Sequence, residues 1–337
     1  MTAREMDEVA RAMIAPGKGI LAADESSPTI AKRFAAIDLE STEESRRAYR
    51  QLLFTAPGIG DHIGGAILYD ESLRQATDDG EPFPEVLEKN GVIPGIKVDK
   101  GATPLAGFPG ETVTEGLDGL RGRLEEYVDL GAKFAKWRAV IHIGANIPTP
   151  TGNDANAHGL ARYAALCQEA GIVPIVEPEV LMDGDHSIER CDEVTSSVLQ
   201  AVFDALFQHG VRLEAMVLKP NMVISGMDAA DRAAPQEVAE ATLQCLLRHV
   251  PPAVPGIAFL SGGQSEAEAT HHLSLLNRLD DAPWQLSFSY GRALQASALK
   301  AWGGKAENVE AGQQAFLNRA RLNGLARSGD YEPSMEG

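Results

Sequence analysis

One lysine of the sequence stands where burial would make it reactive. Lys219 lies in AMVLKPN, after an apolar run and directly before a proline. Burial and a neighbouring cation, which Lys136 could provide, both disfavour the charged form of a lysine amine. A neutral amine can attack a ketone and form a Schiff base. The sequence therefore predicts Lys219 as a nucleophile towards a ketone.

Two glutamates come from the apolar segment that precedes the one carrying Lys219. Glu177 and Glu179 stand two positions apart in IVPIVEPEV. Because side chains alternate along a strand, both carboxylates are expected on the same face. They could act as general acid and general base beside the lysine. They could also be ion-pair partners of Lys136 and Arg138, and the two roles can coexist.

Further polar side chains follow other apolar segments, at the point where each segment ends. They are Asp24, Glu25, Lys97, Asp99, Ser261 and Ser289. Any single one of them could be a strand-end group that reaches water. Burying an ionised group costs several kcal/mol unless it is paired, so such residues seldom enter strands without a role. Their common position therefore predicts one polar catalytic pocket.

Two glycine-bearing turns close the last two apolar segments. One is SGGQS, with Ser261, Gly262 and Gly263, and the other is SYGR, with Gly291 and Arg292. Backbone N–H groups of such turns can approach a phosphate closely at a helix N-terminus. The arginine adds a bidentate donor. The two turns together predict a phosphate site.

The framework that must position these residues is a repeat of strand and helix. Eight short apolar segments alternate with helix-like stretches, and near-continuous apolar runs suit strands buried on both faces. The segments span residues 19–25, 63–70, 93–99, 132–141, 172–180, 213–221, 256–263 and 285–291. Eight alternating units predict a (β/α)₈ TIM barrel of class α/β, whose active site lies at the carboxyl ends of the strands. We expect a single domain over residues 1–337, with a short N-terminal helical extension and a C-terminal tail from about residue 328.

Several helix signals accompany the strands. A helix is predicted from Pro235 to about His249, in which Cys245 lies on the apolar face and is expected to pack in the core rather than react. Ser265 with Glu268 forms a capping box, and Ser41 with Glu44 would form a second one.

Composition excludes several classes of function. The 337 residues include 48 acidic and 30 basic side chains, which gives a net charge of −18. A field of this sign argues against binding nucleic acids or docking on anionic membranes. The three cysteines form no CxxC pair, so we expect neither a disulfide framework nor a zinc knuckle. Such sparse cysteines also favour a location in the reducing cytoplasm. The first residues do not resemble a secretory signal, and no run of about 20 apolar residues suggests a membrane span.

The sequence lacks the motifs of several other chemistries. It contains no HExxH, which would bind zinc, no GxxxxGK[ST] phosphate loop and no GxSxG serine nucleophile. His271 and His272 are expected to face different ways on a helix and to be solvated rather than to bind metal. The acidic stretch Asp183–Ser187 is expected to be a solvated loop between a strand and a helix.

Seven motifs, in order, resemble those of class I fructose-1,6-bisphosphate aldolase. They are GKGILAADES, GIKVDKG, AKWR, VPIVEPEVL, LKPNMV, LSGGQSE and SFSYGRALQASALKAWGG, and the resemblance runs from about Ala12 to Tyr331. It implies a metal-independent barrel enzyme, usually a homotetramer, without a cofactor. It also implies a lyase that cleaves fructose 1,6-bisphosphate reversibly into dihydroxyacetone phosphate and glyceraldehyde 3-phosphate, in glycolysis or gluconeogenesis.

The resemblance also implies roles for the reactive residues. LKPN implies that Lys219 is the Schiff-base lysine. IVEPE implies that Glu177 is the acid/base for forming and dehydrating the carbinolamine, with Glu179 supporting it. AADES implies that Asp24 takes the proton of the C4 hydroxyl, and AKWR implies that Lys136 orients Glu177 and the substrate.

Further residues are implied to hold the substrate. Lys97 and Arg138 resemble substrate contacts. The residues similar to those around the C1 phosphate are Ser261, Gly262, Gly263, Ser289, Gly291 and Arg292. Those similar to the region of the C6 phosphate are Ser26, Thr29, Lys32 and Arg33.

Three departures from the family pattern lead to further expectations. DESSPTI stands where the family commonly has DESTGSI, so Pro28 and Thr29 could alter the C6-phosphate geometry. His142 replaces a lysine of the animal members and is expected to be peripheral. The chain ends at SGDYEPSMEG, and Tyr331 does not match the terminal tyrosine of the family's tail. We therefore expect the enamine to be protonated by another group or slowly.

Other functions remain open at this stage. One is a Schiff-base aldolase that prefers fructose 1-phosphate or sedoheptulose bisphosphate. A second is a barrel scaffold without activity, which the joint presence of Lys219, Glu177, Lys136 and Asp24 disfavours. A metal-dependent aldolase is disfavoured because no histidine cluster is present.

Overall fold

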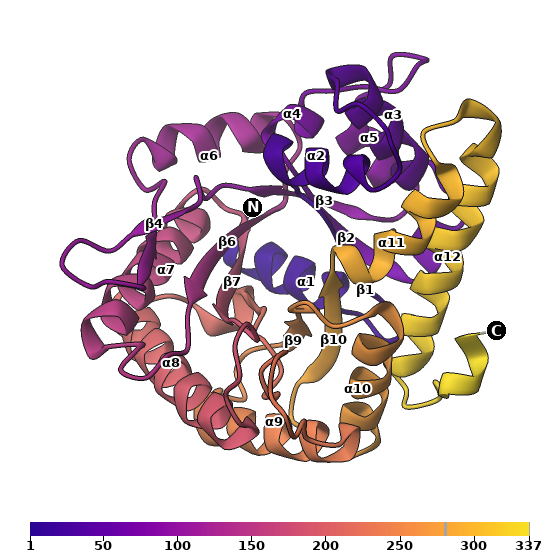
Figure 1. The fold of residues 1–337 in the computed structure, drawn as a ribbon. Coiled ribbons are helices and arrows are strands. Elements are labelled where there is room, and N and C mark those ends of the chain that lie inside the picture. Colours follow the sequence, from indigo (N-terminus) through magenta and orange to yellow (C-terminus); the bar gives the residue numbers. More distant parts are fainter. Residues whose placement is uncertain (280–281, 337) are drawn as a thin grey trace.

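The computed structural model describes residues 1–279 and 282–336 and contains a closed barrel of parallel strands surrounded by helices (Figure 1). The barrel order is β1-β10-β9-β8-β7-β6-β3-β2. The strands are β1 (Gly19–Ala23), β2 (Ile63–Leu68), β3 (Ile93–Lys97), β6 (Phe134–Ile141), β7 (Val173–Val180), β8 (Val217–Leu218), β9 (Gly256–Phe259) and β10 (Gln285–Tyr290). All eight predicted segments therefore contain a barrel strand, and the predicted fold class is confirmed.

Helices cover the outside of the barrel and its amino-terminal end. They are α1 (Ala3–Met13), α2 (Ser27–Ala35), α3 (Glu43–Phe54), α4 (Asp70–Leu73), α5 (Phe83–Lys89), α6 (Leu120–Asp129), α7 (Pro150–Glu169), α8 (Ile188–Gln208), α9 (Pro235–His249), α10 (Glu266–Arg278), α11 (Arg292–Trp302) and α12 (Val309–Ala326). Short 3₁₀ turns occur at Ile59–Asp61, Leu213–Ala215, Ala306–Asn308 and Pro333–Glu336. A small hairpin, β4 (Ala102–Pro104) with β5 (Thr112–Thr114), follows β3 and was not predicted.

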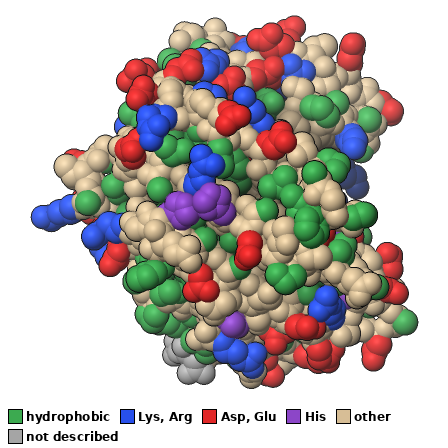
Figure 2. Space-filling view, turned by 90° about the vertical axis from the view of Figure 1, so that its left-hand side faces the viewer, with side chains coloured by type: hydrophobic (Ala, Val, Ile, Leu, Met, Phe, Trp, Pro, Cys, Tyr) green, Lys and Arg blue, Asp and Glu red, His purple; other side chains and the backbone are tan. Residues whose placement is uncertain are grey.

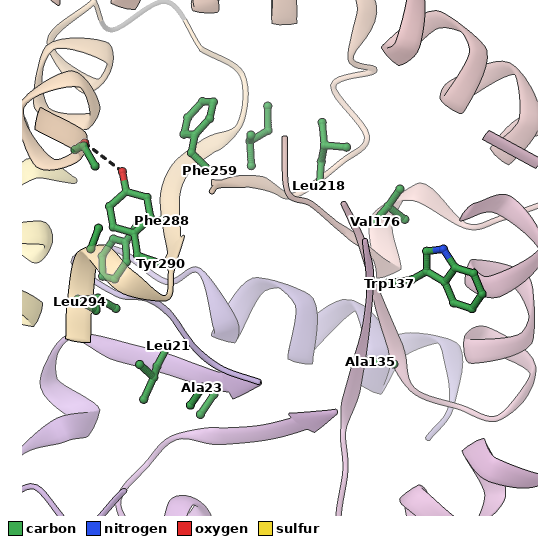
Figure 3. Close-up of a cluster of buried hydrophobic side chains, with 14 of the residues drawn as sticks. Leu21, Ala23, Ala135, Trp137, Val176, Leu218, Phe259, Phe288, Tyr290 and Leu294 are labelled. Carbon is green, nitrogen blue, oxygen red and sulfur yellow. Dashed lines mark hydrogen bonds between the residues drawn. The ribbon is translucent and has the colours of Figure 1, made fainter. Parts of the chain in front are cut away.

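The outer faces of the strands pack against these helices. Side chains such as Leu21, Trp137 and Phe288 point away from the barrel axis into this layer (Figure 3). The Tyr290 hydroxyl donates a hydrogen bond of 3.0 Å to the backbone oxygen of Ala269 in α10. This hydrogen bond satisfies a buried hydroxyl and holds the end of β10 against α10.

The interior of the barrel is apolar only at its amino-terminal end. The residues that fill it include Ile20, Ile67, Phe134, Val173, Ile175 and Val217. Gly95 makes room for the ring of Phe134, because a Cβ built on Gly95 would lie 2.3 Å from that ring. This space for Phe134 is the physical reason for a glycine in the middle of β3.

Helix α1 closes the amino-terminal end of the barrel. Its buried residues Met6, Ala10 and Met13 belong to the same apolar cluster as the interior residues. In Figure 1 this helix crosses behind the centre of the barrel. The predicted N-terminal helical extension therefore seals the bottom of the barrel, which leaves the other end to open.

The structure confirms some local predictions and corrects others. Helix α9 spans Pro235–His249 as predicted, and Cys245 is fully buried in it. The Ser265–Glu268 capping box is present, but the second box is formed by Thr42 and Ser45. The prediction of Ser41 with Glu44 was wrong by one residue, because the chain enters the helix one position later.

The prediction for the two adjacent histidines was wrong in part. His271 is half-buried and His272 is only 3% exposed. His272 lies three residues after Ala269 and four before Leu276, which are both buried, so it shares the apolar face of α10. The Asp183–Ser187 stretch does form the loop between β7 and α8, as predicted.

The C-terminal segment packs on the outside of the barrel. Tyr331 is fully buried, and its backbone oxygen accepts hydrogen bonds from Ser274 (3.0 Å) and Arg278 (2.9 Å) of α10. Residue 337 of the predicted tail lies outside the described residues. None of the helices among the described residues is long and apolar enough to cross a membrane.

The outer surface mixes charges of both signs. On the face shown in Figure 2, acidic and basic side chains are interspersed with apolar ones. The net charge of −18 is therefore spread over a mixed surface here rather than gathered in one acidic field.

Candidate active site

A cavity of about 590 Å³ opens at the carboxyl ends of the barrel strands. Every residue singled out from the sequence as catalytic or substrate-binding lines it. These are Asp24, Ser26, Thr29, Lys32, Arg33, Lys97, Lys136, Arg138, Glu177, Glu179, Lys219, Ser261, Gly262, Gly263, Ser289, Gly291 and Arg292. The structure thus brings together residues from both ends of the chain. His142 and Tyr331 are not among the lining residues.

The alternation along two neighbouring strands explains why charges gather in this cavity. On β6, Phe134 fills the floor of the barrel, while Lys136 and Arg138, at the next positions on the same face, reach the cavity. Arg138 is paired in register with Glu177 of β7. Each strand therefore changes from apolar to charged as it runs towards the open end.

Lys219 lies at the base of the cavity, directly after β8. Its backbone N–H donates a 2.8 Å hydrogen bond to Val176 on β7, which extends the pairing of these two strands. Its Nζ lies 3.2 Å from Oε1 of Glu177, and both side chains are at least 95% buried. A buried amine thus lies within hydrogen-bond reach of a buried carboxylate, the geometry needed for proton transfer between them.

Lys136 joins two of the predicted carboxylates. Its Nζ lies 2.6 Å from Oδ2 of Asp24 and 3.4 Å from Oε2 of Glu177. Burial favours neutral Asp24, but the charges of Lys136 and Lys219 outweigh it and hold the pKa of this carboxyl well below its usual range. Burial likewise favours a neutral Lys136 amine, but Asp24 and Glu177 raise its pKa above the usual range. Asp24 is therefore ionised and Lys136 is cationic at neutral pH.

Arg138 and Glu179 form a second pair in the wall of the cavity. The guanidinium Nε of Arg138 contacts Oε2 of Glu179. Burial opposes the charge of Arg138, but Glu179 and Glu177 raise its pKa. The geometry is compatible with both roles considered for the glutamates. Glu177 contacts the amine of Lys219, as an acid/base group would, and Glu179 is an ion-pair partner of Arg138.

Asp99 was singled out from the sequence only as a strand-end charge, and no individual role was predicted for it. Its Oδ1 lies 2.6 Å from Nζ of Lys97, and its Oδ2 accepts a 3.2 Å hydrogen bond from the backbone N–H of Arg138. It also lines the cavity. Its contact with Lys97 could have been predicted, because strand alternation puts side chains two residues apart on the same face.

The turns after β9 and β10 meet at one side of the cavity. Gly262 and Gly263 both have positive φ (52° and 92°), a conformation that favours glycine. A Cβ built on Gly263 would lie 3.6 Å from Nη2 of Arg292, the first residue of α11. The Oγ of Ser289 is buried there without a hydrogen-bond partner. Two glycines, a helix N-terminus, a guanidinium and a hydroxyl without a partner make a fitting site for a phosphate.

A second group of polar residues lies at the start of α2. Ser26 precedes the helix, its Oγ lies 3.1 Å from Oγ1 of Thr29, and Pro28 occupies the first turn. Proline is well tolerated there because it lacks only an N–H that the helix leaves unpaired. The DESSPTI departure is thus compatible with a regular helix start beside Arg33, which also lines the cavity.

Glu25 anchors that helix to the barrel. It pairs with Arg33, and its Oε2 lies 2.6 Å from Nη2 of Arg50 in α3. Gln295 of α11 donates a 3.1 Å hydrogen bond to its Oε1. Arg50 is 3% exposed and was not found from the sequence, because a single arginine in a helix carries no local signal of its partner.

Across residues 1–279 and 282–336, no group of three or more His, Cys, Asp or Glu side chains is arranged to hold a metal ion. The three cysteines are buried free thiols.

Comparison with known proteins assigns the chain to a family. The family model described as "Fructose-bisphosphate aldolase class-I" matches residues 5–337. The chain belongs to the class I fructose-bisphosphate aldolase family. The resemblance drawn from the seven motifs is thereby confirmed.

Individual relatives agree over nearly their whole length. A "probable fructose-bisphosphate aldolase class 1" of Xanthomonas campestris is 58% identical over 98% of this chain and 100% of its own. A cytosolic fructose-bisphosphate aldolase of Arabidopsis thaliana is 56% identical, covering 99% of this chain and 94% of its own. The muscle-type fructose-bisphosphate aldolase of Lethenteron camtschaticum is 54% identical, covering 99% of this chain and 93% of its own.

A solved structure shares the fold. It is the fructose-bisphosphate aldolase from Plasmodium falciparum in complex with TRAP and a small molecule inhibitor. The TM-score is 0.97 at 50% identity, and the match covers 98% of this chain and 96% of that one.

Proposed function

We propose that this class I aldolase cleaves fructose 1,6-bisphosphate reversibly to dihydroxyacetone phosphate and glyceraldehyde 3-phosphate through a Schiff base on Lys219. The observation that carries the proposal is the 3.2 Å approach of Lys219 Nζ to Glu177 Oε1 at the base of the barrel cavity. A nucleophilic amine and a proton-transfer group are thereby adjacent.

The first stage forms the iminium. Glu177 accepts a proton from Lys219, and the neutral amine attacks C2 of the sugar ketone to give a carbinolamine. Glu177 moves protons between the nitrogen and the departing hydroxyl, which leaves as water. Glu179, paired with Arg138, keeps this part of the wall charged and fixed.

The second stage breaks the carbon–carbon bond. Asp24 accepts the proton of the C4 hydroxyl, the C3–C4 bond breaks, and its electron pair moves towards the iminium nitrogen to give a neutral enamine. Glyceraldehyde 3-phosphate leaves. Lys136 remains cationic and orients Asp24 and Glu177 by ion pairing. Protonation of the enamine at C3 and hydrolysis of the imine then release dihydroxyacetone phosphate and restore Lys219.

The two ends of the substrate are held by different walls. We assign the C1 phosphate to the turns after β9 and β10, with Ser261, Gly262, Gly291 and Arg292. Gly263 and Ser289 complete that wall, and Lys97 and Arg138 contact the sugar between the phosphates. We assign the C6 phosphate to the start of α2, with Ser26, Thr29, Lys32 and Arg33. Two anion sites position the sugar chain across the lysine, which lowers the entropic part of the barrier.

Borohydride trapping tests the mechanism. Reduction in the presence of dihydroxyacetone phosphate should add a covalent label to the peptide that contains Lys219, and K219R should remove it. K305R, at an exposed lysine, is the matched control and should label normally. A label elsewhere, or none, would overturn the mechanism.

Two further measurements test the parts of the proposal that concern metal and substrate. We propose that no metal or cofactor is needed, so EDTA should leave the activity unchanged; complete inactivation would argue for a metal-dependent aldolase.

Two anion sites favour a bisphosphate, so kcat/KM should be higher for fructose 1,6-bisphosphate than for fructose 1-phosphate. A reversed order, or a preference for sedoheptulose bisphosphate, would point to the shifted substrate choice.

We also propose a homotetramer in the cytoplasm. The support is the family resemblance and the cytosolic relative from Arabidopsis. Sedimentation equilibrium checks the assembly, and a mass other than four chains would contradict it.

A further inference from the structure

A buried glutamine lies directly behind the turn after β9. Gln264 follows Ser261, Gly262 and Gly263 and is only 3% exposed. Its Oε1 lies 2.6 Å from Nδ1 of His272, one of the shorter polar contacts between side chains in the protein. The glutamine side chain therefore ties the cavity-lining turn to the second turn of α10.

The turn itself has few other restraints. Its backbone is closed by one hydrogen bond, from the N–H of Gln264 to the oxygen of Ser261 at 2.9 Å. The two glycines between them have no side chains to pack and sit at positive φ, so they constrain the backbone least. The side chain of Gln264, at the end of the turn, must then define where the backbone N–H groups of the turn point.

The direction of the hydrogen bond follows from the second partner of Gln264. Its Nε2 lies 3.8 Å from Sδ of Met222, and a thioether sulfur can only accept. The amide nitrogen therefore faces Met222, the amide oxygen faces His272, and Nδ1 of His272 carries the proton that is donated. Met222 stands three residues after Lys219, so Gln264 also links the turn to the segment that follows β8.

The surroundings of His272 hold its imidazole in one position, as a hydrogen-bond donor needs. It is 3% exposed, and the capping box of Ser265 and Glu268 fixes the start of its helix. Burial lowers the pKa of His272 to about 4, so the ring stays neutral in the working range of pH. A neutral, buried imidazole keeps one tautomer, which is set by the oxygen that it faces.

We propose that His272 is a positioning residue: by donating from Nδ1 to Gln264 it holds the Ser261–Gly263 turn in the shape that receives a phosphate group. The assignment of the turn to the C1 phosphate rests on the proposed function. His272 does not line the cavity and acts only through Gln264. Its loss should weaken phosphate binding while leaving the reactive lysine in place.

Three substitutions separate this role from simple packing. The amide nitrogen of asparagine can occupy the place of imidazole Nδ1, so H272N retains the donor. The longer glutamine in H272Q places its nitrogen near the position of Nε2, and H272L has no donor at all. We expect H272Q and H272L to raise KM for fructose 1,6-bisphosphate and Kd for inorganic phosphate about tenfold. For H272N, both should stay within about threefold of wild type, and kcat should change little in all three.

Unphosphorylated dihydroxyacetone provides the matched control. Borohydride trapping of this ketone on Lys219 needs no phosphate site, so its rate should be the same in wild type and H272L. A general loss of structure would lower both this rate and phosphate affinity. If H272L does not fold, the phosphate affinities of H272N and H272Q decide whether a donor at the place of Nδ1 is needed, because both variants retain a polar amide.

A double-mutant cycle isolates the contact. Q264M removes the acceptor, and its effect on phosphate Kd should not add to that of H272L. Equal phosphate affinity in H272N and H272Q, or additive effects in the cycle, would overturn the proposal. Failure of wild type to trap dihydroxyacetone phosphate would instead contradict the proposed function, while binding of inorganic phosphate would still test His272.

Discussion

The Nζ atom of Lys136 lies 2.6 Å from Oδ2 of Asp24, although their strands are not neighbours in the barrel. Asp24 follows β1 and Lys136 belongs to β6, with β2 and β3 between them. The pair therefore bridges the open end of the barrel above its apolar floor. It places a fixed positive charge between two carboxylates, Asp24 and Glu177, of which one also contacts Lys219.

Removing this charge should impair catalysis strongly. In K136M, Asp24 and Glu177 lose their shared cation, so ionised Asp24 becomes less favourable in its buried position. We expect kcat to fall at least about a hundredfold and the free energy of unfolding to fall by about 3–5 kcal/mol. Steady-state kinetics and urea unfolding measure the two effects. K133M, at a half-exposed lysine just before β6, should change neither, and an equal loss in K133M would refute the explanation.

Asp99 should prove important for substrate binding. D99N replaces a carboxylate that meets the amine of Lys97 and the backbone N–H groups of Arg138 and Gly101. The new amide would turn a donor towards at least one of these donors. We expect kcat/KM for fructose 1,6-bisphosphate to fall about tenfold or more. D118N, at an exposed aspartate, is the control, and near-wild-type kinetics of D99N would show that Lys97 needs no partner.

The fit of Phe134 against Gly95 should limit the stability of the barrel floor. In G95A the new methyl group would overlap the ring, so the ring or the strand must shift. We expect a loss of about 1–3 kcal/mol in the free energy of unfolding. G122A, in exposed helix α6 with open space around the added carbon, should be neutral or stabilising.

A double variant checks the cause of that loss. In G95A/F134L the smaller side chain gives the methyl group room, so the two changes should cost less together than the sum of their separate costs. Strictly additive losses would mean that the ring does not limit position 95. Urea unfolding at one protein concentration measures all four proteins.

His272 should make stability depend on pH between about 7 and 5. Its pKa falls from about 6.5 in the unfolded chain to about 4 in the folded protein. Below pH 6.5 the unfolded chain therefore binds a proton that the folded protein does not, so stability decreases as pH falls. Between pH 7.5 and 5 this group alone should cost about 2 kcal/mol.

Asparagine does not titrate, so H272N isolates the effect. Other buried histidines titrate alike in both proteins. The difference in the free energy of unfolding between wild type and H272N should therefore vary with pH as His272 titrates. Urea unfolding of both proteins at pH 7.5 and pH 5 provides the comparison. Parallel stability curves would show that the buried imidazole is protonated with little penalty.

Much of the site could be predicted before the structure because strand alternation is a local rule. Lys136 and Arg138, or Glu177 and Glu179, stand two residues apart on strands buried on both faces. In a parallel barrel all such strand ends meet at one opening. The cavity therefore contains every residue that the motifs and strand ends selected.

Helix residues were harder to predict. Arg50 in α3 and His272 in α10 reach the site only through a partner, Glu25 or Gln264. Helical spacing tells which face of a helix is buried, but not which loop that face meets. For His272 the spacing from Ala269 and Leu276 was sufficient to predict burial, and the expectation of a solvated ring overlooked it.

The sequence by itself determined the eight repeating units, the change from apolar to charged along β6 and β7, and the family. These follow from local alternation and from motifs, which need no knowledge of distant contacts. Only the tertiary structure decided that Asp24 pairs with Lys136 across the barrel and that Gln264 is held by His272. Both contacts depend on how the barrel closes and how each helix is rotated against it, and these are set by the packing of the whole chain.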